Sequence, residues 1–143
     1  ETDAFSPVSN VHRKEVSGGI TYGAVIHFTN HSVKPNVTKP WKAHDPVKGT
    51  GTGFLLGDKR IITNYHVIAF GASIRVERHG KPGNFEARLL CKSRLCDLAL
   101  LTVDDEAFWT DDLPRVTLQD SVPELDDTVV AVGYPLGAKS VTV

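Results

Sequence analysis

The chain has 143 residues, of which 41% are hydrophobic and 23% charged, an ordinary composition for one compact globular domain or a little more. Its 16 basic and 17 acidic residues give a net charge of -1, so there is no overall basic character that would indicate nucleic-acid binding. No apolar run approaches the roughly 20 residues that span a bilayer, and we expect no membrane-spanning segment.

The beginning of the chain has neither the basic segment nor the apolar stretch of a signal peptide. The sequence also contains no methionine. We therefore interpret it as a processed chain or a fragment rather than a complete initial translation product.

Short β-strands separated by turns are predicted along the chain. Residues 23–29 alternate with a period of two, which predicts a strand covered on both faces or placed in a barrel wall. Residues 30–50 contain three prolines and several lysines, so we expect a long surface loop with Trp41 as its anchor. The further predicted strands are 51–56, 60–64, 73–78, 85–90 and 98–103.

These six strands are enough to close a small antiparallel barrel, so the predicted fold class is all-β. Beyond them, an acidic stretch at 104–116 should pack Phe108 and Trp109 under a loop. The run of ten acids against the single Arg115 over residues 97–127 is interpreted as a set of solvated loops.

Residues 128–132 predict one more strand, ending at the Gly-Tyr-Pro of 133–135. A single strand of a second sheet would leave unpaired edges, so we expect the natural protein to continue past Val143. The expected organisation is an N-terminal extension at 1–22, a complete first barrel at 23–116 with its long loop at 30–50, and a truncated start of a second barrel at 117–143.

Cys91 and Cys96 are the only cysteines. Two cysteines cannot build a disulfide framework, and no paired Cys/His spacing indicates a zinc site. A Cys91–Cys96 bridge is one interpretation, but we favour two small buried hydrophobes at strand ends. Asn30 and Asn36 each begin a formal glycosylation sequon, a pattern too short to fix the compartment.

Two stretches carry candidate chemistry. His66 follows the strand 60–64 and precedes residues 69–71, which we expect to form a single helical turn closed by glycine. Histidine can accept and return a proton near neutral pH, although a histidine in a turn is more often structural. Asp97 lies at the mouth of the strand 98–103, where a partly buried carboxylate needs a partner.

Pairing with the imidazole of His66 would satisfy the carboxylate of Asp97, whereas the plainer interpretation is that Asp97 caps a turn. The order His then Asp within one barrel matches the chymotrypsin-like arrangement, in which the serine comes last, roughly 90 residues beyond the aspartate. The chain ends well before that point. Ser73, Ser121 and Ser140 lack the glycine context of a nucleophile, and we reject all three.

Four motifs in this order give the sequence a specific resemblance to the Deg/HtrA family of serine endopeptidases, from about Gly23 to the end. They are the Gly-Thr-Gly-Phe of 51–54, the Ile-Thr-Asn-Tyr-His-Val-Ile of 62–68, the Cys-Asp-Leu-Ala-Leu-Leu of 96–101 and the Val-Gly-Tyr-Pro-Leu-Gly of 132–137. The cysteine before Asp97, the Phe108–Trp109 pair and the Pro-Trp of the long loop look most like the organellar Deg branch. Tyr65 replaces the alanine usual in the family, and the Gly-Asn-Ser-Gly-Gly segment is missing.

The resemblance implies a trypsin-like fold in which His66 is the general base and Asp97 orients it. It also implies an ATP-independent endopeptidase that degrades misfolded or damaged proteins without metal or cofactor, assembled as a homo-trimer or a multiple of it. The nucleophilic serine would lie beyond this chain, which should be inactive alone. The resemblance favours an organelle or a secretory or periplasmic compartment, and it places the loop 30–50 against a neighbouring subunit or the active-site cleft.

The alternative function is a non-catalytic pseudoprotease or chaperone module that binds unfolded polypeptide. A further alternative keeps the fold but has cysteine as the nucleophile beyond Val143.

Overall fold

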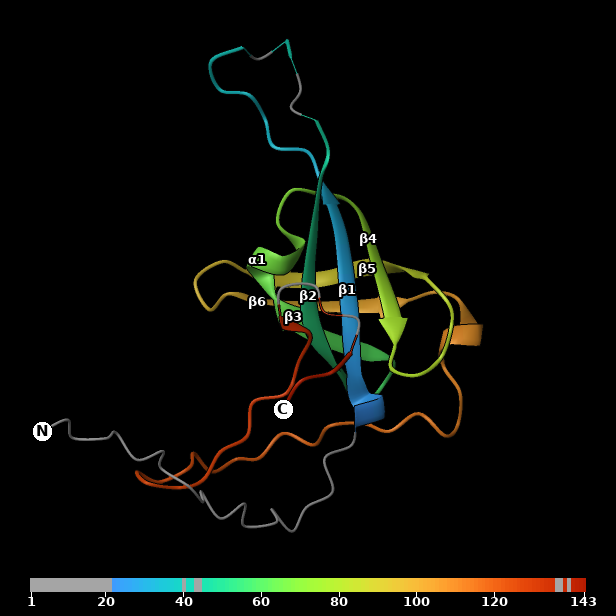
Figure 1. The fold of residues 1–143 in the computed structure, drawn as a ribbon, viewed down its shortest axis with the longest axis vertical. Helices are drawn as coiled ribbons and strands as arrows, with labels where there is room; N and C mark the ends of the chain where they lie inside the picture. The colour runs from blue at the N-terminus through green and yellow to red at the C-terminus, as the bar shows by residue number, and fades with distance from the viewer. Residues whose placement is uncertain (1–21, 40, 43–44, 136–137, 139) are drawn as a thin grey trace, which may run out of the picture.

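The computed structural model describes residues 22–39, 41–42, 45–135, 138 and 140–143. It is a small barrel with a long C-terminal segment that runs beside it (Figure 1). The expected N-terminal extension at 1–22 lies outside the described residues except for Tyr22. The elements of the structure in chain order are the 3-10 turn η1 (Tyr22–Ala24), β1 (Val25–Ser32), β2 (Val47–Leu56), β3 (Arg60–Asn64), α1 (Tyr65–Ile68), β4 (Gly71–Arg78), β5 (Phe85–Ser93), β6 (Leu98–Val103) and the 3-10 turn η2 (Glu106–Phe108).

The six strands form one closed antiparallel barrel in the order β1-β2-β3-β6-β5-β4. This confirms the predicted all-β class and the predicted six-stranded barrel. Closure leaves the ends of the barrel as the places where loops and turns from different strands meet (Figure 1).

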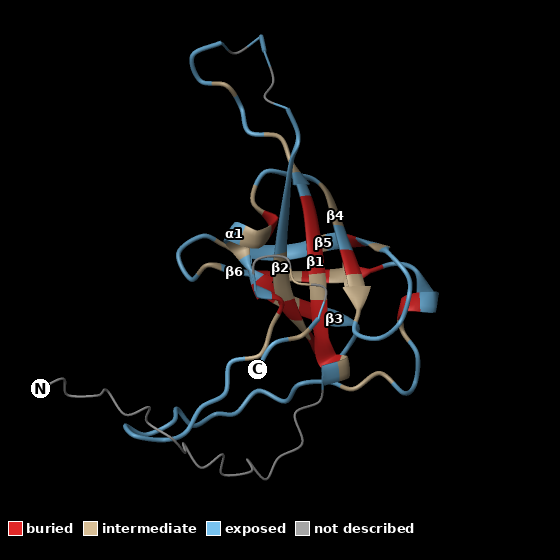
Figure 2. Ribbon diagram, in the orientation of Figure 1, coloured by how far each residue is buried: buried red, intermediate tan, exposed pale blue. Residues whose placement is uncertain are grey.

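The core fills the interior of the barrel, as the buried residues along the strands show (Figure 2). Ile26 and Phe28 of β1 point inward at alternate positions and are fully buried. Gly53 makes room for the ring of Phe28, because a Cβ at residue 53 would lie 2.4 Å from that ring. The other core residues are Ala24, Leu55, Ile61, Ile68, Val76, Ala87, Ala99, Leu101, Val103 and Phe108.

The loop predicted at 30–50 is shorter than expected. β1 continues to Ser32 and β2 begins at Val47, because the two strands stay paired up to the contact between these two residues. The prolines that argued against a strand lie between these ends. Trp41 is 83% exposed, so its predicted role as an anchor is wrong.

The helical turn predicted at 69–71 is also misplaced. The turn is α1, at Tyr65–Ile68, and Gly71 already belongs to β4, where it pairs with Ser32 of β1. Phe70 adopts the left-handed conformation expected of a glycine, with φ of 56°. The chain has to reverse at Phe70 so that β4 can start beside β1.

The strand predicted at 128–132 does not form in the described part of the chain. The described C-terminal segment has one isolated pairing, between Gly133 and Thr142. Val129 is 71% exposed and has no neighbouring strand to pair with. By contrast, Phe108 is fully buried and Trp109 packs against the core, as predicted.

The two thiols also differ from the expectation. Cys91 and Cys96 are both free and both exposed, so they are neither bridged nor buried hydrophobes. Among the described residues, no helix is long and apolar enough to cross a membrane. The division into a first barrel and the start of a second stays a prediction.

Candidate active site

The pairing of β3 with β6 brings His66 and Asp97 together. Asn64, the last residue of β3, lies opposite Leu98, the first residue of β6. His66 follows Asn64 by two residues and Asp97 immediately precedes Leu98, so antiparallel pairing places both at the same end of the barrel. The two residues singled out from the sequence are therefore neighbours in space.

Asp97 holds the whole segment 64–66 through four hydrogen bonds. Its backbone carbonyl accepts from the backbone N–H of Tyr65 at 3.0 Å and from Nδ2 of Asn64 at 3.1 Å. Its Oδ1 accepts from the backbone N–H of His66 at 2.9 Å, and its Oδ2 lies 2.6 Å from Nδ1 of the His66 ring. The φ of Asp97 is 50°, a left-handed conformation that aspartate tolerates better than most residues.

These contacts favour the ionised form of Asp97 and fix which ring nitrogen of a neutral His66 carries the hydrogen. The hydrogen bonds from the ring and the backbone N–H of His66 hold the pKa of Asp97 below its ordinary value. Because an ionised carboxylate only accepts hydrogen bonds, Nδ1 of His66 must carry the hydrogen. Nε2 of the neutral ring is then the free acceptor, and the His66 side chain is 70% exposed. The arrangement can take a proton from a group that approaches Nε2.

Asn30 supports the far end of the turn that carries His66. This residue of β1 is 3% exposed, and its Nδ2 donates to the backbone carbonyls of Val67 at 3.0 Å and Ala69 at 3.3 Å. Carbonyls at the end of a helical turn have no partner within the turn itself. The sequon that Asn30 begins gives no sign of this role, whereas its place in the alternation two residues after Phe28 indicates an inward, buried side chain.

The three rejected serines lie elsewhere. Ser73 is in β4 opposite His31, Ser121 lies in an exposed segment, and Ser140 lines a hollow beside His27 on the outer wall of β1. Within the described residues, no serine hydroxyl hydrogen-bonds to His66. Those residues also contain no cluster of three or more His, Cys, Asp or Glu side chains that could hold a metal.

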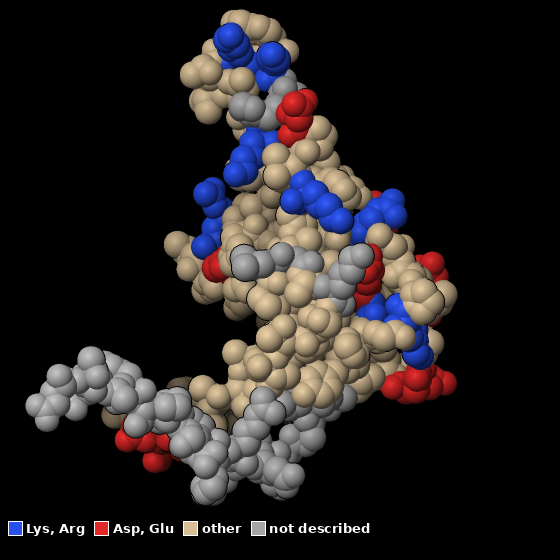
Figure 3. Space-filling model, in the orientation of Figure 1, with Lys and Arg blue, Asp and Glu red and all other residues tan. Residues whose placement is uncertain are grey.

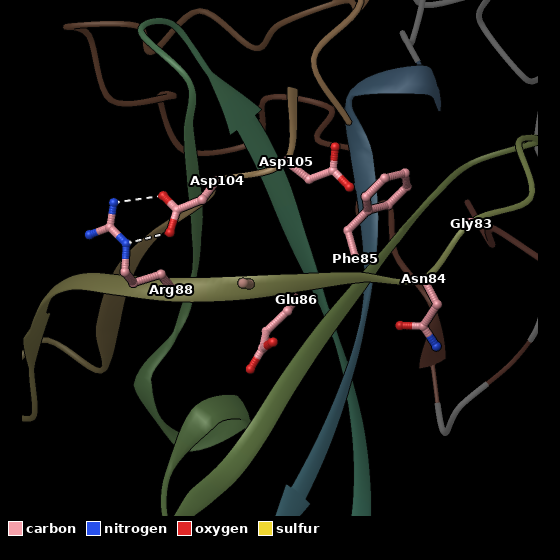
Figure 4. A pocket seen from close by; sticks show the side chains of 8 residues that line it. Gly83, Asn84, Phe85, Glu86, Arg88, Asp104 and Asp105 are labelled. Atoms are coloured by element: carbon pink, nitrogen blue, oxygen red, sulfur yellow. Dashed lines mark hydrogen bonds and ion pairs between the residues drawn. The ribbon is translucent and has the colours of Figure 1, made fainter. Parts of the chain in front are cut away.

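A hollow of about 730 Å³ lies at the opposite end of β5 and β6 from Asp97 (Figure 4). Its lining residues are Gly83, Asn84, Phe85, Glu86, Ala87, Arg88, Asp104 and Asp105. The guanidinium of Arg88 makes two hydrogen bonds of 2.8 Å with the carboxylate of Asp104. The one cation among the described residues that line this hollow, Arg88, is already paired, and His66 with Asp97 remains the candidate site.

The closed antiparallel barrel is that of a trypsin-like protein, and residues 51–143 match the trypsin-like peptidase domain. The chain belongs to this family. Within the family it is similar to the Do-like proteases of the Deg/HtrA type. It is 34% identical to the mitochondrial protease Do-like 4 of Arabidopsis thaliana, over 99% of this chain and 27% of that protein.

Two further relatives have the same level of identity. The chain is 34% identical to the chloroplastic protease Do-like 2 of Arabidopsis thaliana, over 84% of this chain and 19% of that protein. It is 34% identical to the serine protease DegP homolog of Plasmodium falciparum, over 85% of this chain and 14% of that protein. The chain thus spans about a quarter or less of the length of these relatives.

Solved structures agree with the sequence relatives. The active form of the Rv3671c protease from M. tuberculosis matches 85% of this chain and 46% of its own with a TM-score of 0.63 and 25% identity. The serine endoprotease from Yersinia pestis matches 85% of this chain and 39% of its own with a TM-score of 0.63 and 28% identity. The resemblance to Deg/HtrA proteases and the trypsin-like barrel are both confirmed.

Proposed function

We propose that His66 and Asp97 are the general base and the orienting acid of a serine endopeptidase. The observation that supports this most is the double contact of Asp97 with His66, to the backbone N–H through Oδ1 and to the ring Nδ1 through Oδ2. A carboxylate held in this way orients the ring, fixes its tautomer and stabilises the imidazolium that forms when the ring takes a proton.

In the proposed reaction, Nε2 of His66 takes the proton of a serine hydroxyl as its oxygen attacks the peptide carbonyl. The same proton is then given to the leaving amine, and an acyl-enzyme forms that water hydrolyses. We propose that the serine and its oxyanion donors come from residues outside these 143, since the three serines considered within the chain lie away from His66. This chain alone should then be inactive.

The wider role follows from the relatives. Do-like proteases named for mitochondria and chloroplasts support an organellar protease, and we propose unfolded or damaged polypeptide as its substrate without need of ATP. We also propose that it works as a homo-oligomer and that the β1–β2 loop contacts a neighbouring subunit or the cleft. If deletion of residues 34–45 changed neither oligomeric state nor activity, that role of the loop would be excluded.

The test is labelling of the full-length parent protein with a serine-reactive fluorophosphonate, beside His66→Ala and Asp97→Asn. Both variants should lose labelling, and Asp97→Asn should lower kcat on the order of 10⁴-fold, because the wrong tautomer is stabilised. Asp120→Asn is the matched control, since Asp120 is exposed and makes no hydrogen bond or ion pair with the described residues. A folded parent that takes no label would contradict the proposal and favour a binding module.

A further inference from the structure

A cationic patch lies beside the His66–Asp97 pair. The turn between β5 and β6 passes next to α1, which carries His66 (Figure 1). Lys92 near the end of β5 and Arg94 in this turn are both exposed, and Arg94 precedes Asp97 by only three residues. Leu95, at the tip of the same turn, is fully exposed.

The ring of Tyr65 lies close to both cations of this patch. The ammonium of Lys92 lies 5.7 Å from the centre of the Tyr65 ring, and the guanidinium carbon of Arg94 lies 5.9 Å from it. The negative face of an aromatic ring attracts cations at these distances. The ring itself packs against the core, so it is a fixed support, and it belongs to the residue that directly precedes His66.

Neither cation has a counter-ion in the described part of the chain. Two other cations of the barrel are paired, Lys59 with Glu106 and Arg88 with Asp104. The acids that follow β6 begin at its far end, about 20 Å from Asp97 for a strand of six residues. Most of the basic side chains visible in Figure 3 likewise lie in the upper half of the view, toward the β1–β2 loop and α1.

We propose that Lys92 and Arg94, held by Tyr65, make the protease prefer polypeptides with an acidic side chain close to the cleaved bond. This inference rests on the proposed function. In the proposed reaction Nε2 of His66 contacts the serine hydroxyl and the leaving amine, so the cleaved bond lies beside His66. Residues of an extended peptide are only about 3.3 Å apart, which brings a residue close to that bond within reach of the patch around Tyr65. A carboxylate there meets two positive charges that lack a partner, and exposed Leu95 adds apolar contact.

The test uses the full-length protein and quenched fluorescent peptides that share one cleavable sequence. Glu or Gln is placed at one position at a time on either side of the cleaved bond, and kcat/KM is measured for each peptide. At the best position, Glu should exceed Gln by roughly three- to tenfold, as expected for two partly solvated ion pairs. The preference should shrink in about 0.5 M salt, where the screening length is roughly 4 Å.

Two variants probe the patch. The double substitution Lys92→Gln with Arg94→Gln should bring the Glu/Gln ratio to about one while leaving cleavage of the Gln peptide within about twofold. The matched control is Arg60→Gln with Arg75→Gln, which removes the same charge from two exposed cations in β3 and β4 that also have no ion pair among the described residues. That control should keep the full preference, because Arg60 begins β3 at the end away from His66 and screening limits charge effects to about 10 Å.

Tyr65 is tested as a positioning residue. Tyr65→Leu should lower the Glu/Gln ratio, and Tyr65→Phe should restore it, because a phenyl ring keeps the face that attracts the cations. An active protein that cleaves both peptides equally, or whose preference survives loss of both cations, would overturn the inference and leave the proposed function standing. A parent that cleaves neither peptide and takes no fluorophosphonate label would refute both.

Discussion

Replacing the carboxamide of Asn30 with a carboxylate tests how the turn bearing His66 is held. Asn30→Asp keeps the size of the side chain but removes Nδ2, which donates to the carbonyls of Val67 and Ala69. Each net hydrogen bond contributes about 1 kcal/mol, and a buried acceptor left without a donor costs about 1–3 kcal/mol. The free energy of unfolding should therefore fall by at least about 2 kcal/mol, a large share of the 5–15 kcal/mol typical of a native protein.

The chain offers a matched control in Asn36→Asp. Asn36 lies in the β1–β2 loop, and its Oδ1 accepts from the backbone N–H groups of Thr38 and Lys39 and from the Thr38 hydroxyl. Aspartate keeps that acceptor, so this variant should change the free energy of unfolding by no more than about 0.5 kcal/mol. The same chemical change should thus be costly at Asn30 and nearly neutral at Asn36.

Urea unfolding followed by circular dichroism measures the free energy of unfolding of both variants. Its dependence on pH distinguishes the loss of the Nδ2 donor from a packing defect. Burial without a donor raises the pKa of a carboxyl introduced at Asn30. Its destabilisation should be smallest below about pH 4, where the neutral carboxyl can donate, and should grow as pH rises through the raised pKa. Equal loss in the two variants, or a loss at Asn30 that is independent of pH, would refute the role assigned to Nδ2.

Three other predictions concern stability and exposure. Because the pKa of Asp97 is lowered, its contribution to stability is present above about pH 4 and lost as pH falls through the folded-state pKa. Asp97→Asn should therefore be less stable than the wild type at pH 7, and this difference should shrink as the pH of the urea titration is lowered. Gly53→Ala should cost about 1–3 kcal/mol in the same assay, whereas Gly57→Ala should be harmless, since only at residue 53 would the new Cβ collide with its neighbours. Iodide should quench a Trp109→Phe variant strongly and a Trp41→Phe variant weakly, because the remaining indole is 83% exposed in the first and packed against the core in the second; similar quenching would contradict the placement of both.

The barrel could be predicted from the sequence because its strands are short and alternate in polarity, and because two of its turns, at 57–59 and 79–84, contain glycine. β3 and β6 were predicted with their observed ends, since turns at 57–59 and 94–97 delimit them sharply. The extension of the β1–β2 hairpin could not be predicted, because it depends on pairing between Ser32 and Val47, residues 15 positions apart with prolines between them. The β-propensity of a residue describes that residue alone, whereas the length of a paired strand also depends on the strand beside it.

Some residues of the candidate site could likewise be predicted from the sequence, and others could not. His66 and Asp97 could be found because their residue types, their order and the strands beside them together indicate the chymotrypsin-like arrangement of a histidine and an aspartate. The contribution of Asn30 could not be assigned, since the period of two shows that it points inward but not which carbonyls lie above it. Cys91 and Cys96 were misjudged because cysteine is usually buried, whereas here one follows a bulge of β5 and the other lies in an exposed turn.

The contacts that orient His66 all come from one barrel. Asp97 holds the residue through its ring and its backbone, and Asn30 holds the turn from the other side. None of these contacts involves the described residues after β6, so we expect the geometry of the proposed base and acid not to depend on where the nucleophile comes from. In a full-length protein, replacing the nucleophile by alanine should abolish turnover yet leave the Nδ1 proton signal of His66 unchanged in NMR spectra, whereas Asn30→Asp should shift or broaden that signal while the serine is still present. The two halves of the proposed reaction would then be separable, with orientation of the base built into the barrel and only the attacking group supplied from outside it.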